Sequence, residues 1–221
     1  MRGVFVAGTD TGVGKTVLAA AVCAALAARG ERVAAFKPAV SGLDEPPEPG
    51  WPRDQELRAD TASAGQSADD VAPYRFGPPV SPHHAAELAG TVIDPGLLVG
   101  KARAAGEPLV CEGVGGLLVP LTPGYLVRDL AVDLELPVVV AARPGLGTIN
   151  HTLLTVEAAR AAGLRVAGVV MTPWPDEPNA MEHSNRETVE RLGGVPVSGL
   201  PHTDPASLAE AGAALPLDDW F

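Results

Sequence analysis

The chain is poor in cysteine and in aromatic residues. Its 221 residues include two cysteines, and aromatic residues make up 4% of it. Cys23 lies in an Ala-rich stretch and Cys111 in a strand-like stretch, so both are expected to be small buried hydrophobic side chains. This argues against a disulfide framework and against a cysteine metal site. With so few aromatics, Ala, Val, Leu and Gly must fill the core, which suits helices packed closely on a sheet.

Positive charge is also scarce. The chain has 16 Lys and Arg against 27 Asp and Glu, a net charge of −11. Polyanions bind to clustered basic residues, so we expect neither nucleic acid nor an anionic membrane surface as a partner. No apolar run is long enough to span a membrane. The first ten residues do not have the pattern of a signal peptide, because their short apolar stretch runs into a Gly-rich turn. We therefore expect a cytoplasmic protein.

Short apolar strands alternate with longer helical stretches along most of the chain. Residues 4–7 predict a strand, 8–14 a Gly-rich turn, 15–29 a helix and 33–36 a second strand, a unit whose crossover implies parallel strands. Further strands are expected at 109–111, 137–142, 166–171 and 196–200, and further helices at 149–162 and 180–192. The pattern predicts a single α/β domain over residues 1–221, with a doubly wound, mostly parallel sheet and helices on both faces.

Residues 41–82 interrupt this alternation. The stretch begins rich in Pro, Glu and Gly and ends with Pro78, Pro79 and Pro82, with a short helix expected near 54–64. Long loops in compact domains are usually functional or disordered. We expect 41–82 to be an excursion from the sheet that serves the function.

The strongest chemical signal is Gly8–Thr16, Gly-Thr-Asp-Thr-Gly-Val-Gly-Lys-Thr. Its place between a strand and a helix predicts a P-loop, whose backbone N–H groups bind phosphate at a helix N-terminus. Lys15 can reach the β- and γ-phosphates of ATP, and the Thr16 hydroxyl can bind Mg²⁺. The usual pattern has four residues between its glycines, whereas five separate Gly8 from Gly14. The chain is thus expected to be a P-loop enzyme that uses ATP and Mg²⁺.

Two more candidates stand where predicted strands end. Glu112 ends one strand and is followed by three glycines within four residues, and Lys37 ends another. Strand ends border the ligand crevice of an open α/β sheet. Glu112 there could bind Mg²⁺, and Lys37 could neutralise phosphoryl or carbamate oxygens. Taken alone, Glu112 would more often be a solvated acid, and Lys37 could equally be a surface lysine; the P-loop favours a metal ligand at Glu112.

Four segments of this chain occur together and in order. They are Gly8–Thr16, Lys37–Gly42 (Lys-Pro-Ala-Val-Ser-Gly), Arg53-Asp54 and Glu112–Gly116 (Glu-Gly-Val-Gly-Gly). This set resembles the dethiobiotin synthetase family, and Gly145–His151 matches a further segment of it. The resemblance runs from about Arg2 to Asp204. The Lys-Pro-x-x-Ser-Gly and Glu-Gly-x-Gly-Gly segments are much more specific than the P-loop alone.

The resemblance implies a reaction of biotin biosynthesis. An amine of 7,8-diaminononanoate captures CO₂, supplied as CO₂ or bicarbonate, as a carbamate, and ATP transfers its γ-phosphoryl group to that carbamate. The other amine then closes the ring of dethiobiotin, and ADP and phosphate are released. Because this chemistry concentrates negative charge, positioning and cations should supply most of the catalysis.

The resemblance also implies roles for particular residues. Lys15 and Lys37 would be catalytic, and Thr16, Asp54 and Glu112 would hold Mg²⁺. The nucleotide would contact Gly12, Val13, Gly14, Lys15, Thr16, Val17, Asp54, Glu112, Gly113, Val114, Gly115, Pro201, His202 and Thr203. The substrate would contact Thr11, Lys37, Ser41 and, across the interface of a homodimer, Gly147, Thr148, Ile149 and Asn150.

Two positions depart from the family pattern. Many members carry an acidic residue where this chain has Gly12, and many carry an adenine-reading Asn after the strand that here ends at Met171 and continues with Thr172. ATP is the expected nucleotide, and other nucleoside triphosphates remain possible.

Two other functions share the P-loop. An amidotransferase-type ligase would need no Lys37–Gly42 segment. A partitioning ATPase commonly carries an extra lysine early in the loop, where this chain has Thr9, Asp10 and Thr11. His83 and His84 are expected to be polar loop residues, because adjacent residues seldom bind one metal ion.

Overall fold

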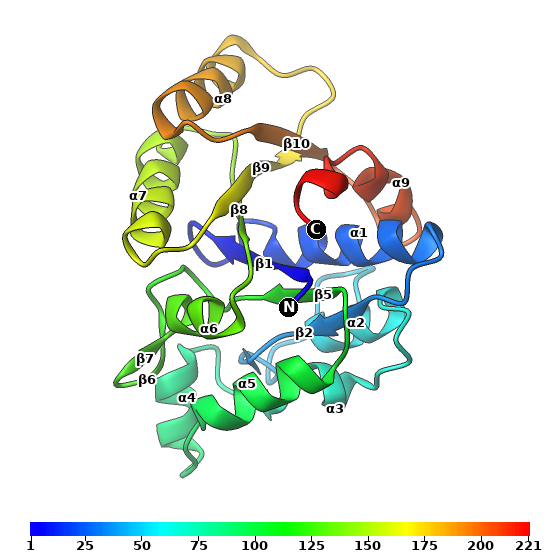
Figure 1. The fold of residues 1–221 in the computed structure, drawn as a ribbon, viewed down its shortest axis with the longest axis vertical. Coiled ribbons are helices and arrows are strands. Elements are labelled where there is room, and N and C mark those ends of the chain that lie inside the picture. Colours follow the sequence, from blue (N-terminus) through cyan, green and yellow to red (C-terminus); the bar gives the residue numbers. More distant parts are fainter.

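A six-stranded parallel sheet runs through the centre of the computed structural model, which describes residues 1–221 (Figure 1). Its strands are β1 (Gly3–Gly8), β2 (Ala34–Phe36), β5 (Leu109–Glu112), β8 (Val138–Ala142), β9 (Val166–Trp174) and β10 (Val197–Pro201). They lie in the order β10-β9-β8-β1-β5-β2, and each neighbouring pair is parallel. From β1 the chain crosses to β2 at one edge and returns through β5 beside β1. It then proceeds through β8 and β9 to β10 at the other edge, which confirms the doubly wound parallel fold.

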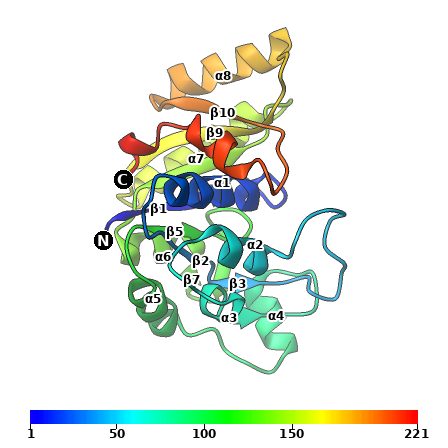
Figure 2. The same ribbon diagram turned by 90° about the vertical axis from the view of Figure 1, so that its right-hand side faces the viewer.

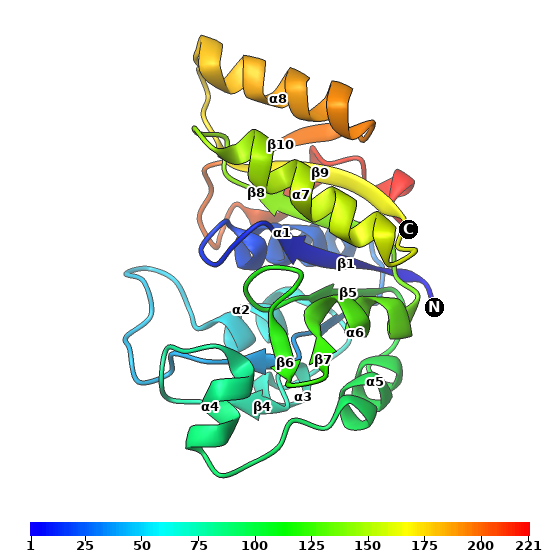
Figure 3. The same cartoon turned by 90° about the vertical axis from the view of Figure 1, so that its left-hand side faces the viewer.

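Helices cover both faces of the sheet. The main helices are α1 (Lys15–Ala28), α2 (Asp54–Thr61), α4 (Pro82–Leu88), α5 (Pro95–Ala104), α6 (Val127–Leu134), α7 (Thr148–Ala161), α8 (Ala180–Gly193) and α9 (Leu208–Ala213). Helices α1, α2 and α9 pack on one face (Figure 2), and α5, α6, α7 and α8 on the other (Figure 3). No helix has both the length and the apolar character needed to cross a membrane.

Strand β1 shows why the sheet is buried on both sides. Phe5 and Ala7 join a cluster of 31 buried residues under α5–α8, whereas Val4 and Val6 join a cluster of 26 under α1, α2 and α9. Successive side chains of a strand point to opposite faces, so a strand between two helical layers must be apolar throughout. The central strands are uninterrupted apolar runs because both of their faces are buried under helices.

Smaller elements complete the fold. They are the parallel pair β3 (Ala39–Val40) and β4 (Tyr74–Arg75), the antiparallel pair β6 (Pro120–Thr122) and β7 (Tyr125–Leu126), helix α3 (Ala68–Val71) and a final 3₁₀ turn, η1 (Leu217–Asp219). Every strand and helix expected from the sequence is present, with ends displaced by no more than three residues. Residues 41–82 contain α3 and β4 besides the expected helix, so this stretch is more regular than its composition indicates.

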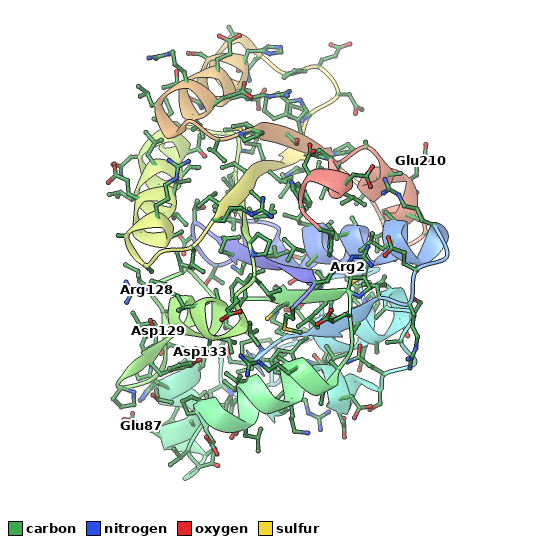
Figure 4. All side chains as sticks on the ribbon, in the orientation of Figure 1. Arg2, Glu87, Arg128, Asp129, Asp133 and Glu210 are labelled. Carbon is green, nitrogen blue, oxygen red and sulfur yellow. The ribbon has the colours of Figure 1, made fainter.

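Charged side chains lie mostly outside this framework. Arg2, Glu87 and Glu210 project from separate parts of the surface, and Arg128 and Asp129 from α6 (Figure 4). Exposed ion pairs contribute little to stability, so the fold depends mainly on the two apolar clusters. Both cysteines are free and buried, as expected.

The last residues of the chain also join the core. Trp220 is 2% exposed and belongs to the cluster under α1. A Cβ atom on Gly168 of β9 would lie 3.3 Å from the indole nitrogen of Trp220, so the glycine makes room for the ring. The C-terminal stretch therefore closes one end of the sheet.

Candidate active site

The loop between β1 and α1 adopts a conformation that depends on glycine. Gly12 and Gly14 have φ angles of 70° and 86°, in the left-handed region that side chains with a Cβ atom rarely adopt. Gly14 is also confined in space, because a Cβ atom there would lie 2.5 Å from Cγ2 of Thr172 at the end of β9. Helix α1 begins directly after this turn, at Lys15. Backbone N–H groups at such a helix start are suited to binding phosphate.

The Lys15 side chain folds back over the loop. Its ammonium nitrogen donates a hydrogen bond of 2.6 Å to the carbonyl oxygen of Asp10. A Cβ atom on Gly8 would lie 2.9 Å from the same nitrogen, so Gly8 leaves the space that Lys15 occupies. Burial lowers the pKa of Lys15, and the nearby carboxylates only partly offset this effect.

Three oxygen-bearing side chains converge beside the loop. The Thr16 hydroxyl, in the first turn of α1, donates hydrogen bonds to Oε1 of Glu112 at 2.9 Å and to Oδ2 of Asp54 at 3.2 Å. Glu112 ends β5 and is in register with Val6 of β1, which places it next to the strand that leads into the loop. Asp54 begins α2. Oxygen ligands from three segments therefore meet at the carboxyl end of the sheet.

Lys37 joins this group from the end of β2. Its side chain is 6% exposed, and its ammonium nitrogen lies 3.1 Å from Oε1 of Glu112 and contacts Oδ2 of Asp54. Burial disfavours the charge on Lys37, but Glu112 and Asp54 outweigh burial and raise its pKa. Partial burial likewise opposes ionisation of Asp54, but Lys37, Arg58 and the Thr16 hydroxyl lower its pKa. Both groups are charged at neutral pH.

Arg58 is a member of the cluster that sequence reasoning missed. Its side chain is fully buried, and its Nη2 atom donates hydrogen bonds to Oε2 of Glu112 and, at 3.2 Å, to the carbonyl oxygen of Thr16. Arg58 lies one turn after Asp54 on α2, and residues four apart share a helix face. That spacing was the available signal, although it does not distinguish a buried arginine from a solvated one.

Thr16, Lys37, Asp54 and Glu112 line a cleft of about 710 Å³, and Arg58 lies behind them. The expected site residues in its lining are Thr11, Gly12, Gly14, Lys15, Thr16, Val17, Lys37, Ser41, Asp54, Glu112, Gly113, Val114 and Gly115. Val13 is 4% exposed and points into the core, so only its backbone could face a ligand. Residues from 41–57 and 79–82, including Trp51, form much of the wall.

The remaining expected residues lie outside this cleft. Gly147, Thr148, Ile149 and Asn150 form the start of α7, where Gly147 has a left-handed φ of 91°. A second hollow, of about 450 Å³, lies between the P-loop, residues 116–120 and α7. Leu118 and Leu154 line this hollow and are 52% and 56% exposed, and Leu146, just before α7, is 94% exposed.

Pro201 is the last residue of β10 and pairs with Trp174 at the end of β9, and His202 and Thr203 follow it. Trp174 lies at that end, with the Arg186 guanidinium 5.6 Å from its ring centroid and His183 edge-on to it. Thr172, two residues earlier, touches Gly14. The end of β9 therefore lies next to the P-loop, on the side away from Lys37, and the end of β10 lies beside β9.

The adjacent histidines are not loop residues, because both lie in the first turn of α4. His83 contacts the Ser81 hydroxyl at 3.1 Å, and His84 contacts Glu87 at 3.0 Å. Proline at the first helical position favours the helix start, a signal that Pro82 offered. No group of three or more His, Cys, Asp or Glu side chains could hold a metal ion anywhere in the chain.

Sequence comparison identifies relatives over most of the chain. The AAA domain family AAA_26 matches residues 2–205. The chain is 39% identical over 204 residues to the ATP-dependent dethiobiotin synthetase BioD of Bacillus subtilis (strain 168), which covers 90% of this chain and 87% of that protein. It is 44% identical over 195 residues to the protein of the same name from Anaeromyxobacter dehalogenans (strain 2CP-1 / ATCC BAA-258), with 87% and 86% covered.

Structural comparison gives more distant neighbours. A ParA family ATPase from Chlorobium tepidum TLS matches with a TM-score of 0.57 at 12% identity, covering 98% of this chain and 93% of that one. The Pyrococcus furiosus cell division ATPase MinD matches with a TM-score of 0.54 at 16% identity, covering 97% and 90%. At such identities the likeness concerns the fold, which these ATPases share.

Proposed function

The chain belongs to the ATP-dependent dethiobiotin synthetase family, and from this membership we propose how its cleft performs the reaction. It is an ATP-dependent ligase that forms carbon–nitrogen bonds in biotin biosynthesis. Its substrates are 7,8-diaminononanoate, CO₂ and ATP, and its products are dethiobiotin, ADP and phosphate. The observation that carries the mechanism is the convergence of Thr16, Lys37, Asp54 and Glu112 beside the P-loop.

Mg²⁺ fits the oxygen atoms that meet in this cluster. Thr16, Asp54 and Glu112 offer one hydroxyl and two carboxylates, and Mg²⁺ prefers oxygen ligands while keeping several waters and phosphate oxygens. Two carboxylates alone make a weak site, so phosphate oxygens of the nucleotide and waters would supply the other ligands. When bound, the ion would neutralise charge on the β- and γ-phosphates.

The P-loop and Lys15 would hold the triphosphate. Backbone N–H groups from Gly12 to Thr16 can face its oxygens, and Lys15 can exchange its hydrogen bond with Asp10 for one to the phosphates. Glu112 to Gly115 and Val17 line the same cleft and would border the nucleotide. Pro201, His202 and Thr203 would lie near the base. ATP is the expected nucleotide, and other nucleoside triphosphates can be tested in its place.

Lys37 would act on the reacting groups. A carbamate oxygen attacks the γ-phosphorus and ADP leaves; the second amine then attacks the carbamate carbon, loses its proton, and phosphate leaves. Both steps place negative charge beside Lys37, whose cation in a buried site stabilises it more than water would. Thr11 and Ser41, also in the cleft lining, would contact the carbamate end of the substrate.

The far end of the substrate would meet a second copy of the chain. Leu118 and Leu154 are exposed in the hollow beside α7, and Leu146 is exposed just before the helix begins. Exposed apolar side chains that lie together favour association. In a homodimer, the α7 start of one subunit, Gly147–Asn150, could bind the carboxylate of a substrate held by the other.

The whole chain would act as one P-loop domain. Residues 41–82 depart from the central sheet, to which the chain returns only at β5, and they contribute one wall of the cleft. We therefore propose that this excursion encloses the carbamate end of the substrate. A cytoplasmic location remains a prediction.

The deciding experiment incubates the protein with 7,8-diaminononanoate, bicarbonate, Mg²⁺ and ATP and follows products by mass spectrometry. We expect dethiobiotin and ADP from the wild type and much less from Lys37→Ala and Glu112→Ala. Phosphate release without ring closure would instead indicate a related ligase. Absence of nucleotide binding would overturn the P-loop interpretation. The partitioning-ATPase alternative has only a likeness of fold in its favour.

A further inference from the structure

The two oxygens of the Glu112 carboxylate have different partners, because Arg58 contacts only one of them. Its Nη2 atom holds Oε2, while Oε1 faces the cleft, where it accepts hydrogen bonds from the Thr16 hydroxyl at 2.9 Å and from Lys37 at 3.1 Å. Both Arg58 and Glu112 are 0% exposed. The carboxylate is therefore held from behind and presents a single oxygen to the cleft.

Stability does not explain a buried arginine at this position. Its Nε and Nη1 atoms are buried and have no hydrogen-bond partner, which costs free energy that the pair with Glu112 must offset. Buried ion pairs are often no more stabilising than hydrophobic side chains of similar volume. Glu112 also has a second cation nearby in Lys37, so it would not lose all compensation without Arg58.

We propose that Arg58 is a positioning residue that confines Glu112 to a one-oxygen contact with the metal ion and thereby favours Mg²⁺ over Ca²⁺. The inference rests on the metal site of the proposed function. Mg²⁺ requires a small octahedral shell, in which each carboxylate gives one oxygen. Ca²⁺ accepts more ligands and often takes both oxygens of a carboxylate. A guanidinium on Oε2 removes the second oxygen that Ca²⁺ would use.

Two variants test whether occupancy of Oε2 controls metal choice. In Arg58→Met the hydrophobic side chain fills similar volume and leaves Oε2 free. In Arg58→Lys the side chain is only one atom shorter, so its ammonium can still donate a hydrogen bond to Oε2. If occupancy controls metal choice, only the Met variant changes it.

The test measures binding of a non-hydrolysable ATP analogue, saturated with Mg²⁺ or with Ca²⁺, by isothermal titration calorimetry. The ratio of the two dissociation constants should shift toward Ca²⁺ by about tenfold in Arg58→Met, the lower end of effects seen for residues behind metal ligands. Arg58→Lys should keep the wild-type ratio. Thermal melting of each variant checks the fold independently of activity.

Three results would overturn the proposal. One is an unchanged ratio in folded Arg58→Met, and another is an unfolded Met variant, since Lys37 should still compensate the Glu112 charge. The third is a wild-type result for Glu112→Ala in the same titration, which would remove the proposed metal site itself. If Glu112→Ala weakens metal-dependent binding while Arg58→Met leaves the ratio unchanged, only the role of Arg58 fails.

Discussion

The ammonium nitrogen of Lys37 lies 3.1 Å from Oε1 of Glu112, the same oxygen that accepts a hydrogen bond from the Thr16 hydroxyl. A lysine cation thus occupies the point where the proposed metal ligands meet. Lys37 and Arg58 together balance the charges of Asp54 and Glu112. Without nucleotide, the cluster offers a divalent cation little net attraction, so metal and nucleotide should bind together.

Removing the Lys37 charge should therefore have two opposite effects. In Lys37→Met we expect Mn²⁺ to bind about tenfold tighter without nucleotide, because the repulsion from a nearby like charge is gone. Turnover should fall by about 10²–10³, the loss typical of a group that stabilises developing charge. Manganese titration by electron paramagnetic resonance and a turnover assay measure the two. Lys101→Met, which removes an exposed lysine on α5, should change neither; unchanged Mn²⁺ affinity in Lys37→Met would contradict the prediction.

Replacement of Gly14 should have two separable effects on stability, one from backbone strain and one from packing. Gly14→Ala should destabilise the protein by about 2–4 kcal/mol, because it adds left-handed strain and a contact with Thr172. Gly30 has a similar φ of 84° with no atom near its virtual Cβ. Gly30→Ala should cost only about 1–2 kcal/mol. Urea unfolding compares them, and equal losses would show that the contact with Thr172 is unimportant.

The packing of α9 on α1 can be tested in the same manner. A Cβ atom on Gly212 would lie 2.1 Å from the carbonyl oxygen of Ala21, so Gly212→Ala should separate the helices and cost about 1–3 kcal/mol. On α5, Gly100 has open space around it. Gly100→Ala should stabilise the protein by about 0.5–1 kcal/mol through helix propensity and reduced unfolded-state entropy. Melting temperatures that move in the same direction would contradict this account.

The proposed dimer depends on the surface around α7. Leu154→Glu places a charge in that surface and should produce monomers, with lower turnover because the partner would no longer complete the substrate site. Leu88→Glu is a matched control on α4, where the side chain is 59% exposed against 56% for Leu154. Light scattering after size exclusion measures the mass. Dimers of Leu154→Glu would place the interface elsewhere.

The buried cluster also predicts how stability depends on pH. Because the pKa of Asp54 is lowered on folding, its contribution is present above its ordinary pKa of 3.8 and is lost as pH falls through the lower folded value. Because the pKa of Lys37 is raised, its contribution is lost only as pH rises past 10.5.

The destabilisation caused by Asp54→Asn should therefore be constant between about pH 5 and 9 and shrink below pH 3.8. Asp69→Asn, at an exposed pair with Arg75, should have little effect at any pH. Urea unfolding of both variants across this range gives the comparison. An Asp54→Asn effect that changes near pH 7 would implicate another group.

The sheet and the P-loop could be predicted from the sequence because each has a strong local pattern. Apolar strands between helices predicted β1, β8 and β9, and glycines before Lys15 predicted the phosphate loop. Two-residue strands such as β3 and β7 show no periodicity and were missed. Helices α4, α5, α6 and α9 were also missed; α5, for example, begins with Pro-Gly, a pair typical of turns. Short-range patterns do not extend to these elements.

The site shows the same division. Glu112 could be expected from its place at a strand end, and Asp54 from the family resemblance. Arg58 could not be predicted, since its helix, Asp-Gln-Glu-Leu-Arg-Ala-Asp-Thr, is so polar that every charge in it resembles a solvated one. Only the packing of α2 against α1 and β5 reveals that this arginine is buried, because its partners are 42 and 54 residues away.

The position of Trp51 in the cleft wall makes the protein its own optical probe. Of its three tryptophans, only Trp51 lines the cleft. Trp174 lies beside Arg186 at the end of β9, and Trp220 is buried under α1. A ligand that enters the cleft should alter the emission of the first and leave that of the last as a constant background. Occupancy of the cleft can then be followed in unlabelled protein by its intrinsic fluorescence.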